Sequence, residues 1–361
     1  MGPATDIALP RRVVVIGTGL IGTSAALALS ERGAEVLLDD RDPEAVRLAV
    51  DIGAGKPYEG EAAERADLAV IAVPPSAVAG TLADAQRRGL ARAYTDVASV
   101  KTRPLAEAAS RGCALADFVG GHPLAGRERS GPAAARADLF LGRPWVLCPS
   151  PATSGDVVEV ATAFVRACGA EPVTLDPAAH DRAVALVSHA PHLVSSAMAA
   201  LLRSPDDTTL SLAGQGVRDV TRIAAGDVDL WTAIATANAD PLADVLEAVA
   251  ADLVATARAL REHRTEAVTT LLRDGRSGQA RLPGKHGART TYTTVTVVVS
   301  DRPGQLARLF DAAGNAEVNI EDVSVEHSPG LPVGVVELYV RPEASAALVD
   351  RLRDDGWSVR G

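Results

Sequence analysis

The sequence predicts an α/β domain with a doubly wound parallel sheet, then an all-helical domain, then a small ferredoxin-like βαββαβ domain. Three observations predict this order. Strand-like runs alternate with helical patterns up to about Pro177, helical periodicity alone follows, and strand-like runs return after residue 290. The expected boundaries are 11–176, 177–272 and 290–361, with a Gly-, Arg- and Pro-rich linker over 273–289.

The first domain begins with a short apolar strand that leads into a helix. Val13–Gly17 has the composition of a buried strand, and Leu20–Arg32 has a helical pattern that Gly33 ends. Continued alternation predicts one parallel sheet with ligands beyond its carboxyl edge. The further strands expected are Ala34–Asp40, Leu68–Pro74 and Ala91–Val97, with WVLCP and EPVTL extending the sheet, and the further helices are Pro43–Asp51, Ser76–Arg88 and Asp156–Cys168.

After about Pro177 the strand signals stop. Apolar residues from Leu242 to Leu260 recur at steps of three or four, and so long an apolar face favours pairing in a homodimer. From residue 290 a β-branched run begins a strand–helix–strand–strand–helix–strand order, which is typical of a ferredoxin-like module.

Composition narrows the classes of function. The 361 residues carry a formal net charge of −10 and only 3% aromatic side chains, which argues against nucleic acid as a partner. The three cysteines are scattered and form no C-x-x-C pair, so we expect neither a disulfide framework nor a thiolate metal site. They are Cys113, Cys148 and Cys168.

No targeting or membrane segment is expected. The N-terminal residues lack the charged region and following apolar region of a signal peptide. The most apolar stretch, Ala183–Leu202, contains His189, Pro191 and His192, so a buried helix explains it better than a membrane span. We therefore expect a cytoplasmic protein with no membrane partner.

A glycine motif, G-T-G-L-I-G over residues 17–22, stands between the first strand and the first helix. Gly17 permits a tight turn, Gly19 lets the backbone approach a pyrophosphate, and Gly22 allows close contact between helix and strand. This context predicts a Rossmann site for a dinucleotide, against the alternative of a turn that binds nothing. The expected cofactor contacts are Gly17, Gly19, Leu20, Ile21, Gly22, Val73 and Pro74.

Two acidic residues, Asp39 and Asp40, end the second strand. A carboxylate there accepts hydrogen bonds from both ribose hydroxyls of an adenosine and repels a 2′-phosphate. Asp40 therefore favours NAD, while the adjacent Arg41 could pair with a 2′-phosphate and leaves NADP open.

Two polar segments lie near the expected carboxyl edge of the sheet. D-V-A-S-V-K follows a strand and carries Ser99 and Lys101, with an ordinary helix start as the alternative. G-G-H-P-L-A-G-R-E-R-S-G places His122 in an irregular loop, where a rigid backbone would hold a proton acceptor. The alternative is a surface histidine, which is the commoner case.

Two further polar segments lie in the helical region. His180 and Asp181 precede S-H-A-P-H, which carries His189 and His192. Contacts to an oxygen-rich substrate fit them better than a metal site, with two ordinary core histidines as the alternative. No metal is expected. In R-D-V-T-R-I-A, Arg218 and Arg222 share one helix face, which suits a carboxylate ligand, with a solvated face as the alternative.

Together these segments resemble the prephenate/arogenate dehydrogenase family of tyrosine biosynthesis. The resemblance runs in order from residue 11 to about 265, and H-P-L-A-G-x-E-x-S-G is its most specific block. Residues 291–361 resemble an ACT regulatory domain, whose ligand-binding turn is matched by D-R-P-G and Asn319-Ile320. The resemblance implies transfer of a hydride from C4 of prephenate to NAD, loss of CO2, and formation of 4-hydroxyphenylpyruvate.

The resemblance also implies roles for individual residues. His122 is the catalytic histidine that accepts the proton of the C4 hydroxyl, and Ser99 helps to hold that hydroxyl. Nearby positive charge should keep the pKa of His122 at or below ~6.5. The implied substrate-binding residues are Arg222, His189, His192, Arg218, Glu128 and Lys101. The implied effector residues are Asp301, Gly304 and Asn319, with tyrosine as the expected effector.

The same residues bear on other possible substrates and on other classes of protein. Arogenate, or 4-amino-4-deoxyprephenate, would replace prephenate without changing the chemistry. A non-catalytic sensor of a nucleotide and an amino acid would not need His122, Ser99 and Arg222 together. A 3-hydroxyacid dehydrogenase should use a lysine base, which the helical region lacks, and a Ser-His-Asp hydrolase needs a G-x-S-x-G motif, which the sequence lacks.

Overall fold

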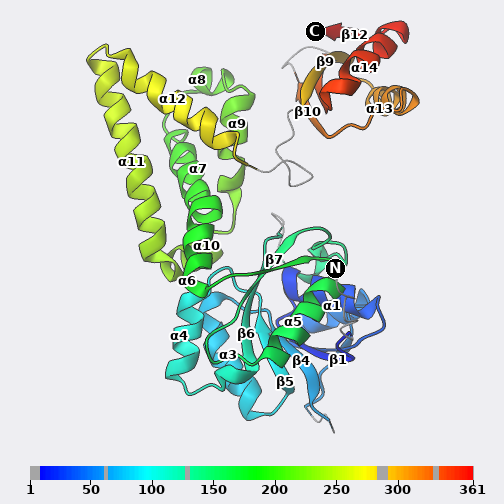
Figure 1. Cartoon of the computed structure of the whole chain (residues 1–361), viewed down its shortest axis with the longest axis vertical. Coiled ribbons are helices and arrows are strands. Elements are labelled where there is room, and N and C mark those ends of the chain that lie inside the picture. Colours follow the sequence, from blue (N-terminus) through cyan, green and yellow to red (C-terminus); the bar gives the residue numbers. More distant parts are fainter. Residues whose placement is uncertain (1–8, 61–63, 127–130, 283–291, 328–332, 361) are drawn as a thin grey trace. The chain divides into compact units, whose positions relative to one another are not determined.

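The computed structural model describes every residue except 1–8, 61–63, 127–130, 283–291, 328–332 and 361 (Figure 1). The chain divides into two compact units, Met1–Ala250 and Ala251–Gly361. The first unit contains the α/β domain and most of the helical segment, and the second contains a small C-terminal sheet.

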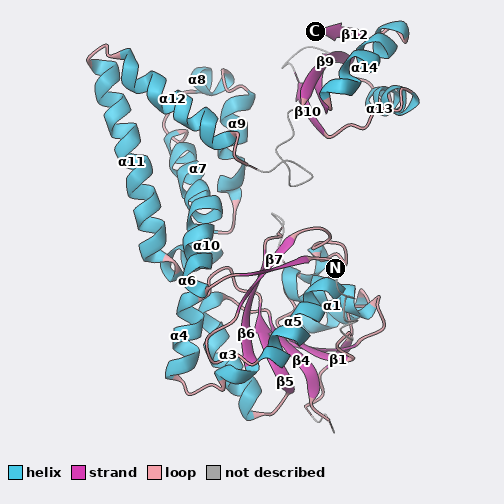
Figure 2. Cartoon of the chain, in the orientation of Figure 1, coloured by secondary structure: helices cyan, strands magenta, loops and turns pink. Residues whose placement is uncertain are grey.

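An eight-stranded sheet forms the centre of the α/β domain (Figure 2). Its strands are β1 (Arg12–Ile16), β2 (Glu35–Asp39), β3 (Lys56–Pro57), β4 (Ala66–Ile71), β5 (Ala91–Asp96), β6 (Phe118–Pro123), β7 (Pro144–Cys148) and β8 (Glu171–Thr174). They lie in the order β3-β2-β1-β4-β5-β6-β7-β8. Strands are added on one side of β1 up to β3 and on its other side from β4 onward. This order confirms the predicted doubly wound topology.

The pairing of β6 with β7 corrects the prediction of an all-parallel sheet, because these two strands are antiparallel. Parallel neighbours need a crossover connection, and the described residues between β6 and β7 include no α-helix, only a short 3-10 turn at Pro132–Ala134. The structure also corrects the irregular loop expected around His122. Residues Gly120 to Pro123 continue β6 and pair with β7.

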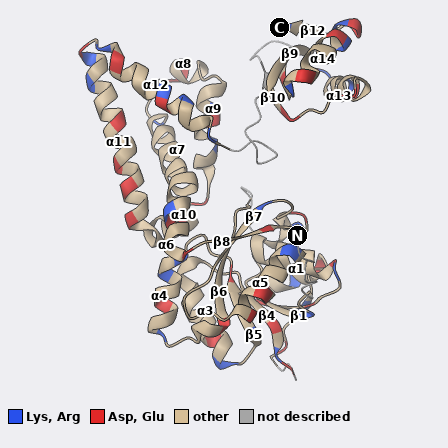
Figure 3. Cartoon of the chain, in the orientation of Figure 1, with Lys and Arg blue, Asp and Glu red and all other residues tan. Residues whose placement is uncertain are grey.

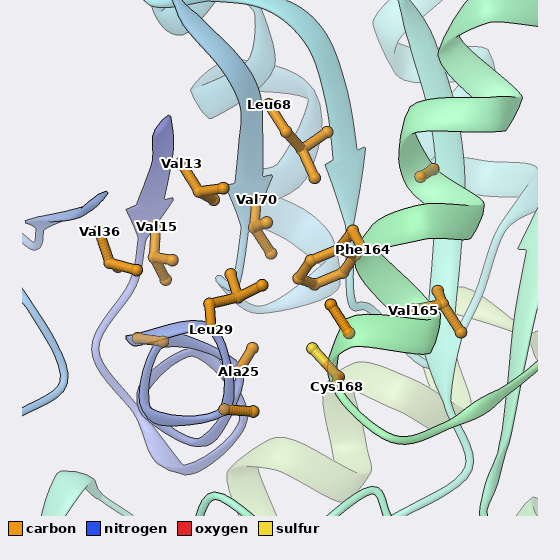
Figure 4. Close-up of a cluster of buried hydrophobic side chains, with 14 of the residues drawn as sticks. Val13, Val15, Ala25, Leu29, Val36, Leu68, Val70, Phe164, Val165 and Cys168 are labelled. Atoms are coloured by element: carbon orange, nitrogen blue, oxygen red, sulfur yellow. The ribbon is translucent and has the colours of Figure 1, made fainter. Parts of the chain in front are cut away.

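Helices cover both faces of this sheet. They are α1 (Leu20–Ser30), α2 (Pro43–Asp51), α3 (Pro75–Arg87), α4 (Thr102–Ser110) and α5 (Gly155–Ala167). Val13 and Val15 of β1 belong to the core that includes residues of α1 and α5 (Figure 4). The alternating residues Val14 and Ile16 belong to a second core that includes residues of α3 and α4. Two buried faces explain why these strands are continuous apolar runs.

A helical segment follows β8, as predicted. It contains α6 (Pro177–Val184), a π-helical turn (Ala185–His189), α7 (Ala190–Leu201), α8 (Asp207–Ser211), α9 (Gln215–Thr221), a 3-10 turn (Arg222–Ala225), α10 (Val228–Ala237), α11 (Ala239–Arg261) and α12 (Thr265–Gln279). The run Pro177–Leu201 is long and apolar enough to cross a membrane by length and composition alone. Its buried His180, Asp181 and His189 are hydrogen-bonded to other parts of the chain, so the packing of a core helix accounts for its composition.

Charge is arranged along α11 as the helix dipole favours. Asp240 lies in its first turn, and Arg258 and Arg261 lie in its last turn (Figure 3). Acidic residues near a helix N-terminus and basic residues near its C-terminus each stabilise the helix by ~0.3–1 kcal/mol.

The start of the expected linker, 273–289, is wrong. Helix α12 continues to Gln279 through Gly275 and Gly278. A glycine costs a helix only ~1 kcal/mol relative to alanine, which is too little to end a helix that the flanking residues support. Residues 283–289 of the expected linker lie outside the described residues.

The C-terminal sheet has the ferredoxin-like order of elements. These are β9 (Thr293–Ser300), α13 (Gln305–Asn315), β10 (Asp322–His327), β11 (Val333–Val340), α14 (Pro342–Asp354) and β12 (Ser358–Arg360). The strand order is β10-β11-β9-β12 and every pair is antiparallel. Burial alternates along β9 and β11, so one face of the sheet packs on the two helices. The elements follow each other in the predicted order, strand–helix–strand–strand–helix–strand.

The turn from β1 into α1 depends on two of its three glycines. Gly17 has φ of +106°, and a Cβ there would lie 2.2 Å from the carbonyl oxygen of Ala72. A Cβ on Gly22 would lie 2.0 Å from the oxygen of Gly17. Gly19 differs, because a Cβ there would meet nothing within 4 Å. Two glycines are therefore required by the fold, whereas Gly19 leaves open space beside the helix N-terminus.

We expect Gly17→Ala to lower the free energy of unfolding of the α/β domain by a few kcal/mol, through backbone strain and the clash with Ala72. Gly19→Ala should change it by less than ~0.5 kcal/mol in the absence of any nucleotide. Urea unfolding of the two variants and the parent measures both effects. Equal losses from the two substitutions would contradict the assignment.

Candidate active site

A buried ion pair holds the backbone on which the site is built. Lys101 Nζ donates to Asp96 Oδ2 at 2.5 Å and to the carbonyl oxygen of Gly121 at 2.6 Å, and the two side chains are 2% and 1% exposed. Asp96 Oδ1 accepts from the N–H of Gly121 at 2.9 Å. Both peptide groups of Gly121, the residue before His122, are therefore fixed by charged partners.

This pair corrects the expectation that Lys101 offers its charge directly to a substrate. The ammonium group points into the protein toward Asp96 and Gly121, where it is nearly inaccessible. The segment D-V-A-S-V-K leads into α4, in agreement with the alternative of an ordinary helix start. Lys101 is the N-cap residue of that helix. Ser99 lies half-buried between β5 and α4.

His122 lies near the carboxyl end of β6, which runs parallel to β5. The strand approaches β5 so closely that a Cβ on Gly121 would lie 2.5 Å from the carbonyl oxygen of Asp96. Because β5 also runs parallel to β4 and β4 to β1, His122 lies at the same edge of the sheet as the glycine turn after β1. The histidine and the glycine turn are thus on the edge where such sheets bind ligands.

Two residues of α6 continue the site behind His122. Its Nδ1 lies 2.8 Å from Nε2 of His180, and Nδ1 of His180 lies 2.9 Å from Oδ1 of Asp181. Asp181 also accepts from the backbone N–H of Lys101 (Oδ1) and of Thr102 (Oδ2), both at 2.8 Å. The carboxylate therefore caps α4 while it contacts the histidine chain.

The environment keeps the imidazole of His122 neutral. Burial, and then the neighbouring His180, Lys101 and His189, hold the pKa of His122 well below its usual value of 6.5. The predicted direction of this pKa shift is confirmed, and Lys101 contributes to it as a neighbouring charge rather than as a substrate ligand. A neutral imidazole has a free lone pair, which a proton acceptor requires.

The π-helical turn brings histidines of α6 and α7 to one side. In an uninterrupted α-helix, at roughly 3.6 residues per turn, His189 would lie about half a turn away from His180. The turn at Ala185–His189 winds more widely and reduces that offset. Pro191 follows it and has no N–H to bond to the carbonyl of Val187, which removes one α-helical hydrogen bond at this point.

Asn238 fixes the orientation of His189. Its Nδ2 donates to the carbonyl oxygen of Asp181 at 2.8 Å and lies 3.1 Å from Nδ1 of His189. Because an amide nitrogen is only a donor, Nδ1 of His189 accepts and its proton is on Nε2. Burial lowers the pKa of His189 to about 4, so this imidazole is a neutral hydrogen-bond donor at neutral pH.

An aromatic stack encloses the other side of the histidine cluster. The ring of His192 stacks on Trp231 with centroids 3.6 Å apart, and His189 meets the same indole edge-on at 6.2 Å. Gly226 packs against both partners, since a Cβ there would lie 2.6 Å from Trp231 Nε1 and 2.8 Å from His192 Cε1. Burial lowers the pKa of His192, so it too is neutral at neutral pH.

The glycine turn has the shape that a dinucleotide needs. Open space beside Gly19 leaves room for a ligand against the N-terminus of α1. Asp40 Oδ2 accepts from the N–H of Thr18 at 2.6 Å, which places this carboxylate directly beside the turn. Arg41 is exposed next to it, and Val73 and Pro74 lead from β4 into α3. The residues present therefore fit a bound dinucleotide.

The remaining predicted residues lie in three places. Arg218 and Arg222 are exposed, on α9 and on the 3-10 turn that precedes Gly226. Glu128 lies outside the described residues. In the C-terminal sheet, Gly304 has φ of +84° and caps α13, and Asn319 donates to Glu321 Oε1 at 2.8 Å. Asp301 is exposed just after β9. No group of three or more metal-ligating side chains occurs in the part of the chain that the structure describes.

Several residues that shape the site have no clear signal in the sequence. His180 and Asp181 are only a polar pair there, and their contacts with His122 and Lys101 join segments far apart in the chain. Asp96 is the first residue of D-V-A-S-V-K, and only the structure shows its pairing with Lys101. Asn238 and Trp231 gave no sequence signal, because an isolated amide or indole in a helix is ordinary.

A nucleotide-binding sheet whose edge carries a half-buried, neutral imidazole has the parts of a dehydrogenase that removes a hydroxyl proton. Comparison with known proteins agrees. The prephenate dehydrogenase nucleotide-binding domain matches residues 25–174, and the prephenate dehydrogenase dimerization domain matches residues 176–274. The chain belongs to the prephenate dehydrogenase family and is an enzyme of that family.

Individual relatives cover most of the chain. The probable prephenate dehydrogenase NovF of Streptomyces niveus is 41% identical over 96% of this chain and 99% of its own. The structure of Synechocystis arogenate dehydrogenase is 27% identical, with a TM-score of 0.64 over 74% of this chain and 98% of that one. Prephenate dehydrogenase from A. aeolicus, in complex with hydroxyphenyl propionate and NAD+, is 23% identical, with a TM-score of 0.67 over 76% and 99%.

We expect Lys101→Met to lower the free energy of unfolding by about 3–5 kcal/mol, because it leaves the buried carboxylate of Asp96 without its cation. Arg103→Met is the matched control. Its pair with Glu107 is 51% and 33% exposed and should be worth no more than ~1 kcal/mol. Urea unfolding compares the two variants. A loss at Lys101 no larger than at Arg103 would contradict the clamping role.

Proposed function

We propose that the chain catalyses the NAD-dependent oxidative decarboxylation of prephenate to 4-hydroxyphenylpyruvate. The observation that carries this proposal is His122, a half-buried imidazole that its surroundings keep neutral, at the nucleotide-binding edge of the sheet. Family membership narrows the substrate to a cyclohexadienyl acid. Aromatisation of the ring supplies the driving force, so the protein has mainly to orient the groups and accept one proton.

The cofactor we propose is NAD. The open space at Gly19 and the N-terminus of α1 would receive the pyrophosphate, and Asp40 would repel a 2′-phosphate. The solved A. aeolicus relative holds NAD+, which is in keeping with this choice. Arg41 keeps NADP as the alternative to be measured. When bound, the nicotinamide ring supplies the hydride acceptor.

We propose the following roles for the chain's own residues. His122 accepts the proton of the substrate's C4 hydroxyl, and Ser99 helps to hold that hydroxyl. His189, as a neutral donor on Nε2, and His192, held against Trp231, line the pocket. Arg222 binds a substrate carboxylate, with Arg218 and Glu128 as further pocket residues. Lys101 positions His122 through the carbonyl of Gly121 and does not bind the substrate directly.

Arogenate is the second candidate substrate, and a related structure, that of Synechocystis arogenate dehydrogenase, is the observation that favours considering it. The two substrates differ only in the side chain that carries a keto or an amino group.

We further propose that the chain is a cytoplasmic homodimer that pairs through its helical segment, which matches the family's dimerization domain.

The C-terminal sheet is proposed to be an ACT regulatory domain that binds an amino acid, with tyrosine as the first candidate. Its sheet order and the left-handed turn at Gly304, between Asp301 and α13, support this assignment. Asn319 would be the third effector residue.

The proposal is tested by following NADH or NADPH at 340 nm with prephenate or arogenate and NAD+ or NADP+, for the parent and His122→Asn. The parent should be fastest with prephenate and NAD+. The variant should lose about 10²–10⁴-fold in kcat with KM nearly unchanged, because it lacks the base. A normal kcat in the variant would refute the role of His122, and inactivity with all four pairs of substrate and cofactor would refute the function.

The pH dependence of the parent tests the same residue. Its kcat/KM should stay level down to pH 6.5 and fall only below it, because protonation of His122 removes the acceptor and the pKa of His122 lies below that value.

Titration calorimetry with tyrosine and phenylalanine tests the effector site. We expect heat with tyrosine for the full chain and none for a chain that ends near Arg289. Absence of heat with both ligands, or binding that survives the truncation, would remove the effector assignment.

A further inference from the structure

His180 and Asp181, which continue a chain of hydrogen bonds from His122, have no role in the function proposed above. This chain crosses from β6 to α6, and it runs from the half-buried His122 to His180 and Asp181, which are only 1% and 3% exposed. Because the three polar side chains are hydrogen-bonded in sequence and end on a carboxylate, the donor in one hydrogen bond determines which nitrogen carries the proton in the next.

The donor-to-acceptor direction of these hydrogen bonds follows from the charge of Asp181. Burial alone would raise the pKa of this carboxyl, but hydrogen bonds from His180, Thr102 and Lys101 bring its pKa below the usual value of 3.8, so it is ionised. An ionised carboxylate only accepts hydrogen bonds, so Nδ1 of His180 carries a proton and donates it. In a neutral His180 the other nitrogen, Nε2, is then an acceptor.

The same logic sets the state of His122. With His180 neutral, its Nε2 accepts, and Nδ1 of His122 at 2.8 Å then carries the proton. The neutral imidazole of His122 then has its lone pair on Nε2, the nitrogen that does not face His180. His189 has the opposite arrangement, with its proton on Nε2 because Asn238 occupies Nδ1. The site thus holds one imidazole that accepts and one that donates.

We propose that His180 and Asp181 are positioning residues that hold His122 in the Nδ1–H tautomer, so that Nε2 is always the base. This inference rests on the proposed function for its consequence in catalysis. When Nε2 takes the proton from the substrate hydroxyl, that O–H bond breaks and an N–H bond forms. The resulting imidazolium keeps its Nδ1–H bond to His180, which donates in turn to Asp181. The positive charge therefore faces a chain that ends on a carboxylate.

The groups around His122 make this arrangement necessary. His180 faces it from α6, Lys101 from the segment between β5 and α4, and His189 from the π-helical turn. The ammonium of Lys101 opposes a second positive charge nearby. Asp181, one residue beyond His180, is the carboxylate through which the chain can offset a charge on His122.

Two substitutions at His180 separate hydrogen bonding from packing. His180→Gln keeps an oxygen that can accept from His122 and an N–H that can donate to Asp181. His180→Leu has a similar volume and neither group. We expect the leucine variant to lose at least about 100-fold in kcat with little change in KM, and the glutamine variant to stay within about tenfold of the parent. His263→Gln, at an exposed histidine outside the site, is the matched control and should leave both constants unchanged.

Nitrogen NMR provides a readout that a merely structural role would not move. With ¹⁵N-labelled histidine the seven residues can be resolved, and His122→Asn identifies the signals of His122. In the full-length parent at neutral pH we expect a protonated Nδ1 and an unprotonated Nε2 for His122. The leucine variant should shift His122 toward the Nε2–H tautomer, and the glutamine variant should not.

Each outcome decides the inference. A proton on Nε2 of His122 in the parent overturns it, and so do equal kinetic losses in folded glutamine and leucine variants. If the leucine variant does not fold, the parent spectrum and the glutamine variant still decide. If the parent oxidises neither prephenate nor arogenate, the proposed function fails, while the tautomer measurement still tests the chain of hydrogen bonds on its own.

Discussion

The carboxylate of Asp181 is the interaction on which the candidate site depends. It accepts hydrogen bonds from the first N–H groups of α4 and from the imidazole of His180, and the backbone carbonyl of the same residue accepts from Asn238 near the end of α10. Three elements that are distant in sequence meet at this one residue. Without it, several buried donors would lose their partner, each at a cost of ~1–3 kcal/mol, and the histidines would lose their common frame.

A second carboxylate, Asp96, serves the strand rather than the histidines. With Lys101 it fixes the two peptide groups that precede His122, so the base is carried by a backbone with little freedom to move. The positive charge that this arrangement places near His122 also disfavours its protonation. The buried pair therefore gives rigid placement, and its ammonium adds to burial and to His180 in keeping the imidazole neutral, without any contact with a substrate.

Local patterns predicted the alternation of strands and helices, the glycine turn and the order of the C-terminal elements. They failed where tertiary contacts decide. Gly120 and Gly121 look like a loop in sequence, yet they lie in β6 and pair with β7, and β5 approaches Gly121 too closely for a Cβ. Lys101 looks like a substrate ligand until its buried partner is known. The contacts of Asn238 could not be predicted, because they depend on how α10 packs on α6 and the π-helical turn.

The π-helical turn at Ala185–His189 makes the site depend on how this segment winds as well as on which residues it contains. Its wider winding sets the rotational phase of everything that follows, including His189 and His192, relative to His180. The same residues wound as a regular α-helix would carry the later histidines toward a different side, with every side chain of the site still present. A substitution that only favours regular winding in this turn would therefore disrupt the histidine cluster without removing any of its members.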